Sequence, residues 1–182
     1  MTEDLSKKSN IVLIGMPGSG KSTVGIILAK ILARNFVDTD VLIQLQEGLT
    51  LQEIIDSSDY MALRRIEEEV LIGIDHRQHV VATGGSAPYS HRAMAHLRED
   101  GIIVFLDADL PCLCSRIQNY QTRGLAKRPE QSFQELFAER YRLYSRYSDI
   151  TIDCSARSQE EVCQAIIDQL DRHRCRQDHE HH

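Results

Sequence analysis

The chain has 182 residues, of which 42% are hydrophobic and 26% are charged. This length and composition are typical of one globular domain and exclude a globally disordered or fibrous protein. The formal net charge of −6 argues against binding duplex DNA through a general basic field, and 5% aromatic residues without tryptophan are too few for base-stacking platforms. We therefore expect no nucleic-acid partner.

Cysteines and apolar runs indicate the compartment. The five cysteines form no C-x-x-C pair, and an odd number in a chain without an export signal is typical of reduced thiols. The first ten residues are polar, and no apolar run is long enough to span a membrane. We expect a cytoplasmic protein with no membrane partner.

Short apolar runs alternate with stretches of helical periodicity along the chain. In chain order, the pattern predicts a strand at Ile11–Ile14, a helix at Lys21–Arg34, a strand at Phe36–Val37, helices at Val41–Gln46, Leu51–Asp56 and Asp59–Asp75, a strand at Val80–Ala82, a helix at Ser90–Glu99, a strand at Ile102–Leu106, helices at Leu110–Asn119 and Ser132–Tyr147, a strand at Ile150–Ile152 and a helix at Gln159–Arg172. Such alternation implies βαβ units. The predicted fold class is α/β, with a central parallel sheet of about five strands between two helical layers.

Two polar segments lie outside these elements. The segment 119–131 contains Gly124 and Pro129 among polar residues, which predicts a loop. The tail 173–182 is polar and His-rich, and we interpret it as a frayed, disordered terminus. A metal site in the tail is the alternative, but its composition implies no fixed ligand geometry.

The firmest signal is a glycine-rich loop. Residues 15–22 read G-M-P-G-S-G-K-S, which matches G-x-x-x-x-G-K-[ST] without deviation. Glycines let backbone N–H groups wrap around phosphate, and the following helix N-terminus adds a partial positive charge. The expected nucleotide-binding residues are Gly15, Met16, Pro17, Gly18, Ser19, Gly20, Lys21, Ser22 and Thr23, with Lys21 on the β- and γ-phosphates and Ser22 on Mg²⁺.

This loop predicts an ATP or GTP site, because a chance glycine-rich turn would have to fall between a strand and a helix by accident. A GTPase switch should also carry N-K-x-D and D-x-x-G, and the sequence contains neither. The chain is also short for a motor or helicase domain. A small kinase is the interpretation that remains.

Further motifs follow the loop in order. They are Phe36-Val37-Asp38-Thr39-Asp40, Leu63-Arg64-Arg65-Ile66-Glu67-Glu68-Glu69, Ala82-Thr83-Gly84-Gly85, Arg128-Pro129, and Glu139-Arg140 followed by Leu143-Tyr144. Each motif is weak by itself, but their order and spacing are specific. From about Asn10 to Leu170 the sequence resembles the shikimate kinase family, in the nucleoside-monophosphate-kinase-like group. The resemblance implies a P-loop fold that binds ATP and Mg²⁺.

Two carboxylates follow the second predicted strand. Asp38 and Asp40 would lie at the carboxyl end of that strand, where open α/β sheets bind ligands. Carboxylates there suit a divalent cation and a hydroxyl nucleophile, whereas a helix N-cap is the simpler alternative. The resemblance implies that Asp38 holds Mg²⁺ through water. It also implies that Asp40 hydrogen-bonds the substrate hydroxyls and is a candidate to accept the proton.

Arginines on two predicted helices are candidates for binding an acid. Arg64 lies three residues before Glu67, so an exposed ion pair along the helix is the simpler reading. The resemblance implies instead that Arg64 clamps the substrate carboxylate, with Glu67 orienting it, and that Arg140 is a second clamp. Two guanidinium groups suit a carboxylate because each can bind it bidentately. For Arg65 we favour the exposed ion pair.

Two glycines follow a predicted buried strand. Gly84 and Gly85 fit an ordinary turn, but the resemblance implies that their amides contact the substrate near the γ-phosphate. The resemblance further implies that Arg116 packs on the adenine.

The loop 119–131 corresponds to the closing lid in this resemblance. A lid arginine would stabilise the charge on the transferred phosphoryl group and the lid would exclude water. Arg128 matches the Arg-Pro pattern, and Arg123 is the alternative. Counted from Arg116 to Arg128, the lid is several residues longer than we expect for the family.

Other departures fall on the substrate side. Ser86 replaces the third glycine of the family motif, and Leu63 and Ile55 stand where aromatic residues are expected. Without those flat walls, and with the carboxylate clamp kept, the pocket leaves room for another hydroxy or amino acid such as homoserine.

These observations predict a single kinase domain over residues 1–182, with a substrate-binding segment at about 38–75. The predicted enzyme is a monomer that moves the γ-phosphoryl group of ATP to a hydroxyl of a small carboxylate, shikimate first. The alternatives are a kinase of another acid such as homoserine, and a nucleotide-binding regulator without turnover.

Overall fold

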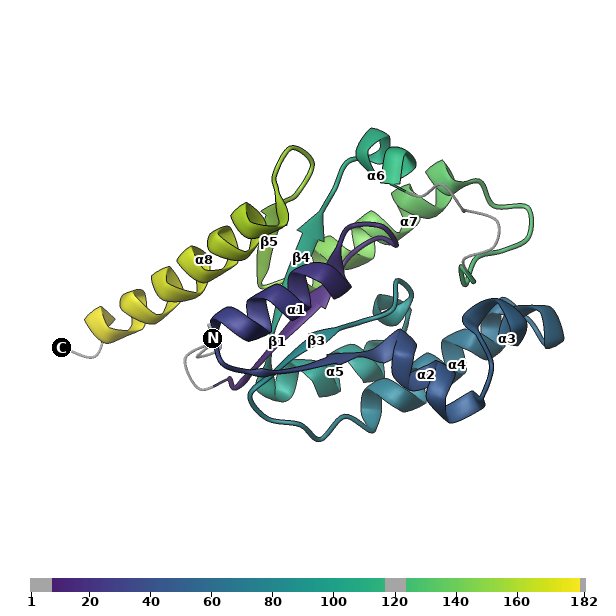
Figure 1. The fold of residues 1–182 in the computed structure, drawn as a ribbon, viewed down its shortest axis with the longest axis horizontal. Coiled ribbons are helices and arrows are strands. Elements are labelled where there is room, and N and C mark those ends of the chain that lie inside the picture. The colour runs from purple at the N-terminus through teal and green to yellow at the C-terminus, as the bar shows by residue number, and fades with distance from the viewer. Residues whose placement is uncertain (1–7, 117–123, 181–182) are drawn as a thin grey trace.

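The computed structural model describes residues 8–116 and 124–180, and its strands form one parallel sheet (Figure 1). The strands are β1 (Asn10–Ile14), β2 (Asn35–Asp38), β3 (His79–Ala82), β4 (Gly101–Asp107) and β5 (Ile150–Asp153). The helices are α1 (Lys21–Ile31), α2 (Thr39–Glu47), α3 (Leu51–Ser57), α4 (Tyr60–Ile72), α5 (His91–Asp100), α6 (Leu110–Arg116), α7 (Phe133–Tyr147) and α8 (Gln159–Glu180). The order across the sheet is β2-β3-β1-β4-β5.

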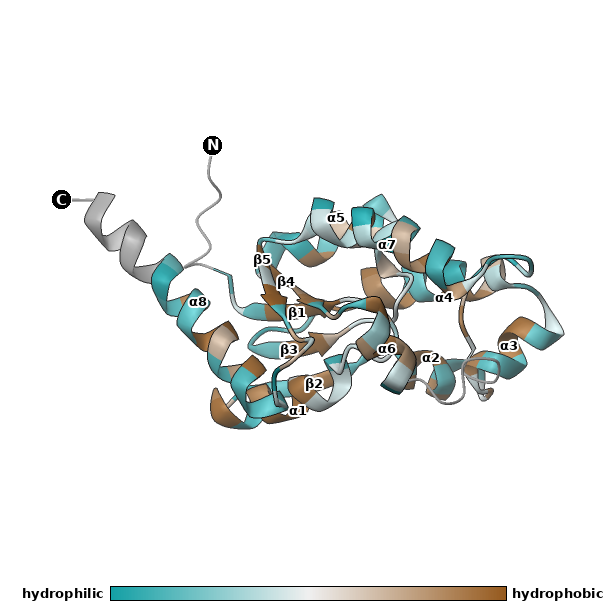
Figure 2. Ribbon diagram, turned by 90° about the horizontal axis from the view of Figure 1, so that it is seen from above, coloured by the Kyte–Doolittle hydropathy of each residue, from teal (hydrophilic) through white to brown (hydrophobic). Residues whose placement is uncertain are grey.

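Helices cover both faces of the sheet. In Figure 2 the strands lie between α1 and α8 on one side and α5 and α7 on the other. Contacts between α1 and α8, and between β4 and both α5 and α7, agree with this view. The three-layer α/β fold predicted from the alternation of strands and helices is therefore confirmed.

The central strands β1 and β4 are apolar because both faces of the sheet are covered. All five residues of β1, N-I-V-L-I, are buried, as are six of the seven in β4. The main core forms around them, with Val24 and Leu28 of α1 on one face and Met94 and Leu97 of α5 on the other.

The register brings the carboxyl ends of the strands to one edge. Asp38 is paired with Ala82, Ala82 with Leu13, and Leu13 with Val104. The residues that follow these positions therefore emerge side by side. In an open parallel sheet this edge is where ligands bind.

A second, smaller core holds the helices α2, α3 and α4 together. It contains Ile43, Ile54, Leu63, Val70 and Ala126, so the end of the expected lid packs on the same residues. Side-chain caps set the starts of these helices: Thr50 caps α3 in a capping box with Glu53, and Asp59 caps α4. Figure 1 shows this group of helices at one end of the molecule.

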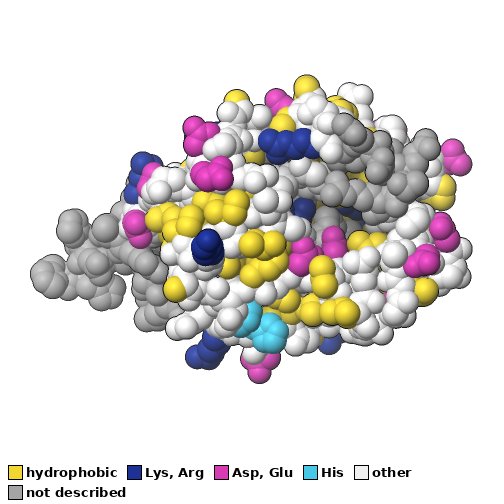
Figure 3. All heavy atoms as spheres, in the orientation of Figure 1, with side chains coloured by type: hydrophobic (Ala, Val, Ile, Leu, Met, Phe, Trp, Pro, Cys, Tyr) yellow, Lys and Arg dark blue, Asp and Glu magenta, His cyan; other side chains and the backbone are white. Residues whose placement is uncertain are grey.

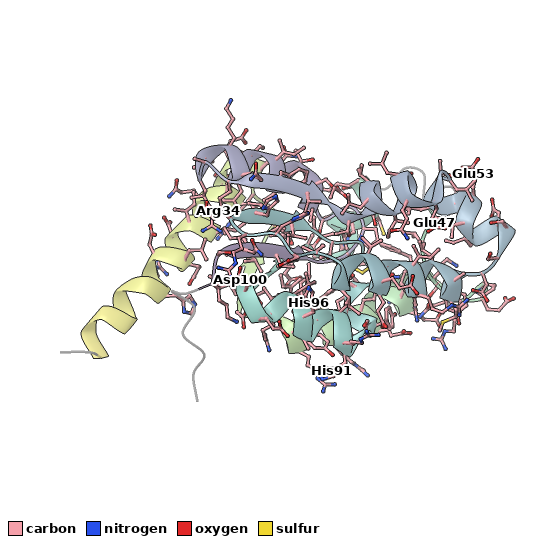
Figure 4. The ribbon with its side chains drawn as sticks, turned by 90° about the horizontal axis from the view of Figure 1, so that it is seen from below. Arg34, Glu47, Glu53, His91, His96 and Asp100 are labelled. Atoms are coloured by element: carbon pink, nitrogen blue, oxygen red, sulfur yellow. The ribbon has the colours of Figure 1, made fainter. Side chains whose placement is uncertain are left out.

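The opposite end of the sheet is closed by polar contacts. Ser9 donates its backbone N–H to Asp100 at the end of α5 (3.1 Å), and its carbonyl accepts from the Arg34 guanidinium. Figure 4 shows Arg34 and Asp100 at this end, and Glu47 and Glu53 at the end that carries α2 and α3. The amino end of β1 is thereby tied away from the ligand-binding edge.

Among the described residues, three helix ends differ from the sequence prediction by three or more residues. The helix α1 stops at Ile31 rather than Arg34, because Ala33 adopts a positive φ of 51°. The helix α4 stops at Ile72 rather than Asp75, because Gly73 caps it. The helix α8 continues to Glu180, through the tail that we expected to be frayed, since this stretch contains neither glycine nor proline to end it. The last residues of the predicted helix Leu110–Asn119, from 117 onward, lie outside the described residues.

None of the helices in the described part of the chain has the length and apolar character needed to cross a lipid bilayer.

Gly25→Ala should destabilise the fold where α1 packs on β2. A Cβ at this position would lie 2.5 Å from a ring carbon of Phe36, so the ring must shift in a close-packed core. We expect a loss of about 1–3 kcal/mol in the free energy of unfolding, measured by urea denaturation. Gly73→Ala is the control, since its Cβ would have ordinary contacts of 3.4 Å and longer and it has a helical backbone. Equal stability of the two variants would contradict this packing.

Candidate active site

The phosphate loop joins β1 to α1, as the sequence predicts. Gly15, Gly18 and Gly20 have φ angles of 150°, 84° and 98°, which residues other than glycine rarely adopt. A Cβ on Gly15 would also lie 2.8 Å from the carbonyl oxygen of Leu106. Backbone conformation therefore favours glycine at all three positions, and at Gly15 lack of space also requires it.

The loop presents positive charge to an anion. The residue before α1 is Gly20, which supplies no side-chain cap, and the first turn of α1 contains no acidic residue. The amides of this turn and the helix dipole are thus available for phosphate. The exposed Thr23, expected among the nucleotide-binding residues, also lies in this first turn and lines the cavity described below.

Lys21 is buried at the base of the loop. Its ammonium group donates to the carbonyl oxygens of Gly15 (2.9 Å) and Met16 (3.0 Å). Burial lowers the pKa of Lys21 to about 8, against the opposing effect of Asp40 and Asp38. An anion in the loop would stabilise the charged form and offer the ammonium group a stronger acceptor than these carbonyls.

Asp38 performs two local tasks. Its Oδ1 accepts from the backbone N–H of Asp40 (3.0 Å) and so caps α2, as the simpler reading of the sequence suggested. Its Oδ2 accepts from the hydroxyl of Ser22 (2.5 Å). The two residues expected to hold Mg²⁺ thus lie in contact, and both offer oxygen donors, which this cation prefers.

A cavity of about 970 Å³ opens at the carboxyl edge of the sheet. It is lined by the phosphate loop, by residues of α2 and α4, by Gly85 and Ser86 after β3, by residues 124–126 and by Arg140. Figure 3 shows the hollow, with basic side chains inside it and acidic ones along its rim. The expected nucleotide and acid sites therefore share one continuous space.

Two arginines from distant parts of the chain converge on one oxygen atom. Arg64 from α4 donates to the carbonyl oxygen of Ala126 (3.1 Å), and Arg140 from α7 donates to the same oxygen (2.9 Å). The side chain of Arg140 is almost fully buried, and burial also lowers the pKa of Arg64. The Nε atoms of both residues are buried and have no partner within the described part of the chain. Two guanidinium groups with spare donors around one acceptor are suited to a carboxylate.

Gly84 and Gly85 lie beside these arginines. A Cβ on Gly85 would be 2.7 Å from a terminal nitrogen of Arg140, and the Gly85 carbonyl accepts from the buried hydroxyl of Tyr144 (2.6 Å). Both glycines are therefore needed for close approach of side chains, beyond a turn alone.

Glu67 has a different partner from the one expected. Its carboxyl group is 3% exposed and its Oε2 accepts from the hydroxyl of Ser86, the residue that replaces the third glycine. A Cβ built on Gly84 would lie within 2.6 Å of both Glu67 Oε1 and Asp40 Oδ1. The carboxyl groups of Glu67 and Asp40 therefore lie close to each other. Burial and the nearby Asp40 raise the pKa of Glu67 to about 7.

The other arginines that the sequence singled out differ in their position relative to the cavity. Arg116 at the end of α6 lines the cavity and donates to the Cys154 carbonyl (3.4 Å), beside the loop that precedes α8. Arg128 is not brought to the cavity: it is largely exposed and pairs with Glu139 (3.1 Å). Arg123 lies outside the described residues. Arg65 is exposed on α4, as expected.

The sequence interpretation missed Tyr89. Its ring lies against the Arg64 guanidinium, with 3.5 Å between Cζ and the ring centroid. No motif marks this residue, and its only signal is a place four residues after Gly85, in the turn that leaves the ligand-binding edge.

Comparisons with known proteins agree with one another. The family model described as shikimate kinase matches residues 17–171. The shikimate kinase of Sulfurihydrogenibium sp. is 34% identical over 164 residues, covering 90% of this chain and 98% of that protein. The shikimate kinase of Caldanaerobacter subterraneus subsp. tengcongensis is 35% identical over 161 residues, covering 87% and 94%. A solved shikimate kinase from Acinetobacter baumannii, in complex with shikimate, has a TM-score of 0.82 and 30% identity, covering 90% of this chain and 93% of its own.

Glu67→Gln should remove a pH dependence of stability. Because the pKa of Glu67 is raised from its ordinary 4.5 to about 7, the folded protein holds a proton over this range that the unfolded chain releases. The free energy of unfolding should therefore fall as the pH rises from 4.5 to 7, and glutamine, which cannot ionise, should abolish that fall. Urea denaturation between about pH 5 and pH 8 measures it.

Glu69→Gln is the control, because Glu69 is exposed on the same helix and its loss should leave the fall in stability in place. Parallel stability curves for the wild type and Glu67→Gln would contradict the burial of an ionisable carboxyl at this position.

Proposed function

The chain belongs to the shikimate kinase family, and on this premise we propose that it transfers the γ-phosphoryl group of ATP to the 3-hydroxyl of shikimate. Members of this family are phosphotransferases with an alcohol group as acceptor. The products would be ADP, 3-phosphoshikimate and the proton of the hydroxyl group. The observation that carries the proposal is the convergence of Arg64 and Arg140 on the carbonyl oxygen of Ala126, because Ala126 and Arg140 line the cavity that begins at the phosphate loop.

The nucleotide half of the site is assigned to the loop and its flanks. The amides of residues 15–23 would bind the phosphates, and Lys21 would leave the Gly15 and Met16 carbonyls for the β- and γ-oxygens. Arg116 would pack on the adenine, with the loop before α8 opposite it.

Ser22 and Asp38 are assigned to Mg²⁺. The hydroxyl would ligate the ion directly and the carboxylate through water, and the rest of its shell would come from phosphate oxygens and water. In the part of the chain that the structure describes, no group of three or more His, Cys, Asp and Glu side chains could hold a metal. When bound, Mg²⁺ neutralises charge on the β- and γ-phosphates.

The acid half is assigned to the two arginines. Arg64 and Arg140 would exchange the Ala126 carbonyl for the substrate carboxylate, and this ion would also satisfy their unpartnered Nε donors. Asp40 would accept from the attacking hydroxyl, and the Gly85 amide would fix the other end of the acid. The Gly84 N–H donates to the hydroxyl of Thr39 (3.0 Å) and could contact the acid only after leaving it. Positioning contributes most to such a transfer because the transition state is loose.

The lid arginine is the least constrained assignment. Arg128 could neutralise the transferred phosphoryl group only after leaving Glu139, and Arg123 is the alternative. We propose that a monomer is active. The substrate-binding segment is 38–75 and the lid 119–131, within a single kinase domain.

A second acceptor, homoserine, is favoured by one specific observation. Glu67 Oε1 is buried without a partner among the described residues, and it faces Gly84 together with Asp40. Two carboxyl groups beside a carboxylate clamp match an amino acid, whose ammonium group would lie between them. The aliphatic side chains of Leu63 and Ile55 are also compatible with an acceptor that has no flat ring.

Turnover of the purified wild-type protein tests the proposal. ADP release in a coupled assay, with ATP, Mg²⁺ and either acid, should be rapid with shikimate and at background with homoserine or with no acid. Activity with homoserine and none with shikimate would show that homoserine is the acceptor. Binding of ATP without ADP release with either acid would indicate a nucleotide-binding regulator.

Arg140→Ala should raise the KM for the acid by roughly tenfold or more, because a charge-assisted hydrogen bond to a carboxylate is lost. The KM for ATP should change little, since the phosphate loop is intact. Initial-rate kinetics with each substrate varied in turn measure both constants. Arg142→Ala, which removes an exposed arginine from the same helix, is the control. An unchanged KM for the acid would remove Arg140 from the clamp.

A further inference from the structure

Tyr89 lies between the acid-binding arginines and the lid. It ends the 3₁₀ helix Ala87–Tyr89, just after the glycine pair and Ser86, and it is half-buried. Its ring and its hydroxyl group each contact a different part of the site.

The ring supports the guanidinium groups. The Cζ of Arg64 lies 3.5 Å from the ring centroid of Tyr89, and that of Arg140 lies 5.6 Å from it. The ring of Tyr60 flanks Arg64 at 5.2 Å. The negative face of an aromatic ring attracts a cation, and the attraction is strongest where the cation is desolvated.

The hydroxyl group leads to the lid. It donates to Glu139 Oε1 (2.5 Å), the residue next to Arg140 on α7. Glu139 Oε2 accepts from Gln131 (2.7 Å) and from Arg128 (3.1 Å), both at the end of the lid. Tyr89 therefore touches α4 with its ring and reaches α7 and the lid through one carboxylate.

The contacts of Tyr89 offset a repulsion between two positive charges. Two guanidinium groups that donate to the same oxygen repel each other, and Arg140 is almost fully buried, where screening by water is weak. The Ala126 carbonyl carries no net charge to hold them together. An aromatic face beside both cations, anchored by Glu139, offsets the repulsion while the acid is absent.

We propose that Tyr89 is a positioning residue of the carboxylate clamp: its ring holds Arg64 in place facing Arg140. This inference rests on the proposed function, because the clamp matters only if an acid is the acceptor. Tyr89 acts through the arginines and does not itself touch the reacting atoms.

Two substitutions separate the ring from the hydroxyl group. Tyr89→Leu removes both contacts, and Tyr89→Phe keeps the ring over Arg64 while losing the bond to Glu139. We expect Tyr89→Leu to raise the KM for shikimate by roughly tenfold with the KM for ATP unchanged, and Tyr89→Phe to restore the KM for shikimate to within about threefold of the wild type. Tyr147→Leu, which removes a ring that lies near Arg146 and His91, is the control and should change neither constant.

The kinetic outcomes separate the two proposals. If the wild type does not turn over shikimate, the proposed function fails. If the wild type is active and Tyr89→Leu has the wild-type KM for shikimate, the role of Tyr89 is wrong. A parallel rise of both KM values, together with a lower melting temperature, would show that Tyr89 merely supports the fold, which also overturns the proposal.

Crystal structures of the unliganded variants test Tyr89 without any substrate. Arg64 should still donate to the Ala126 carbonyl in Tyr89→Phe and should have left it in Tyr89→Leu. Retention of both arginine bonds to Ala126 in Tyr89→Leu would overturn the proposal, whatever the acceptor of the enzyme is.

Discussion

The proposed acid-binding half of the site depends on one constraint. The positively charged side chains of Arg64 and Arg140 are held around a single oxygen atom. Arg64 and Arg140 come from helices on either side of the lid in the sequence, and neither has its full set of hydrogen bonds. Removing such groups from water is costly unless acceptors replace the lost solvation. The Ala126 carbonyl, the Tyr89 ring and Glu139 supply part of that replacement, and a substrate carboxylate would supply more.

The parallel sheet joins this anion site to the phosphate site. The order β2-β3-β1-β4-β5 puts the phosphate loop after β1, the glycine pair after β3, and Asp38 at the end of β2 along one edge. Since these strands are neighbours, a hydroxyl held near Asp40 and Gly84 would lie beside the loop. In the proposed reaction, the topology would thus fix the nucleotide and the acid relative to each other, which is the main requirement of a transfer that relies on positioning.

The features predicted well from the sequence are local ones. The phosphate loop, the buried strands and the carboxylates after β2 are set by short motifs and by hydrophobic patterns, and each lies where the pattern implied. The bond between Ser86 and Glu67 joins residues 19 positions apart, and the bond between Arg64 and Ala126 joins residues 62 apart. Such contacts depend on how helices pack, which periodicity does not report. Arg128 shows the same limit: its Arg-Pro pattern gave no sign that Glu139 would hold it outside the cavity.

The departures from the family pattern follow a physical logic. Leu63, where an aromatic residue was expected, belongs to the small core under α2–α4 and packs with Ala126 of the lid, so its aliphatic shape serves that core. Aromatic surface is present instead in Tyr60 and Tyr89, whose rings face Arg64. Rings that stack on the clamp rather than on the acceptor leave shape selection to the polar groups. Under the proposed function, discrimination between acids would then depend on Asp40, Glu67 and Ser86, because a buried polar group left unpaired by the wrong acid is costly.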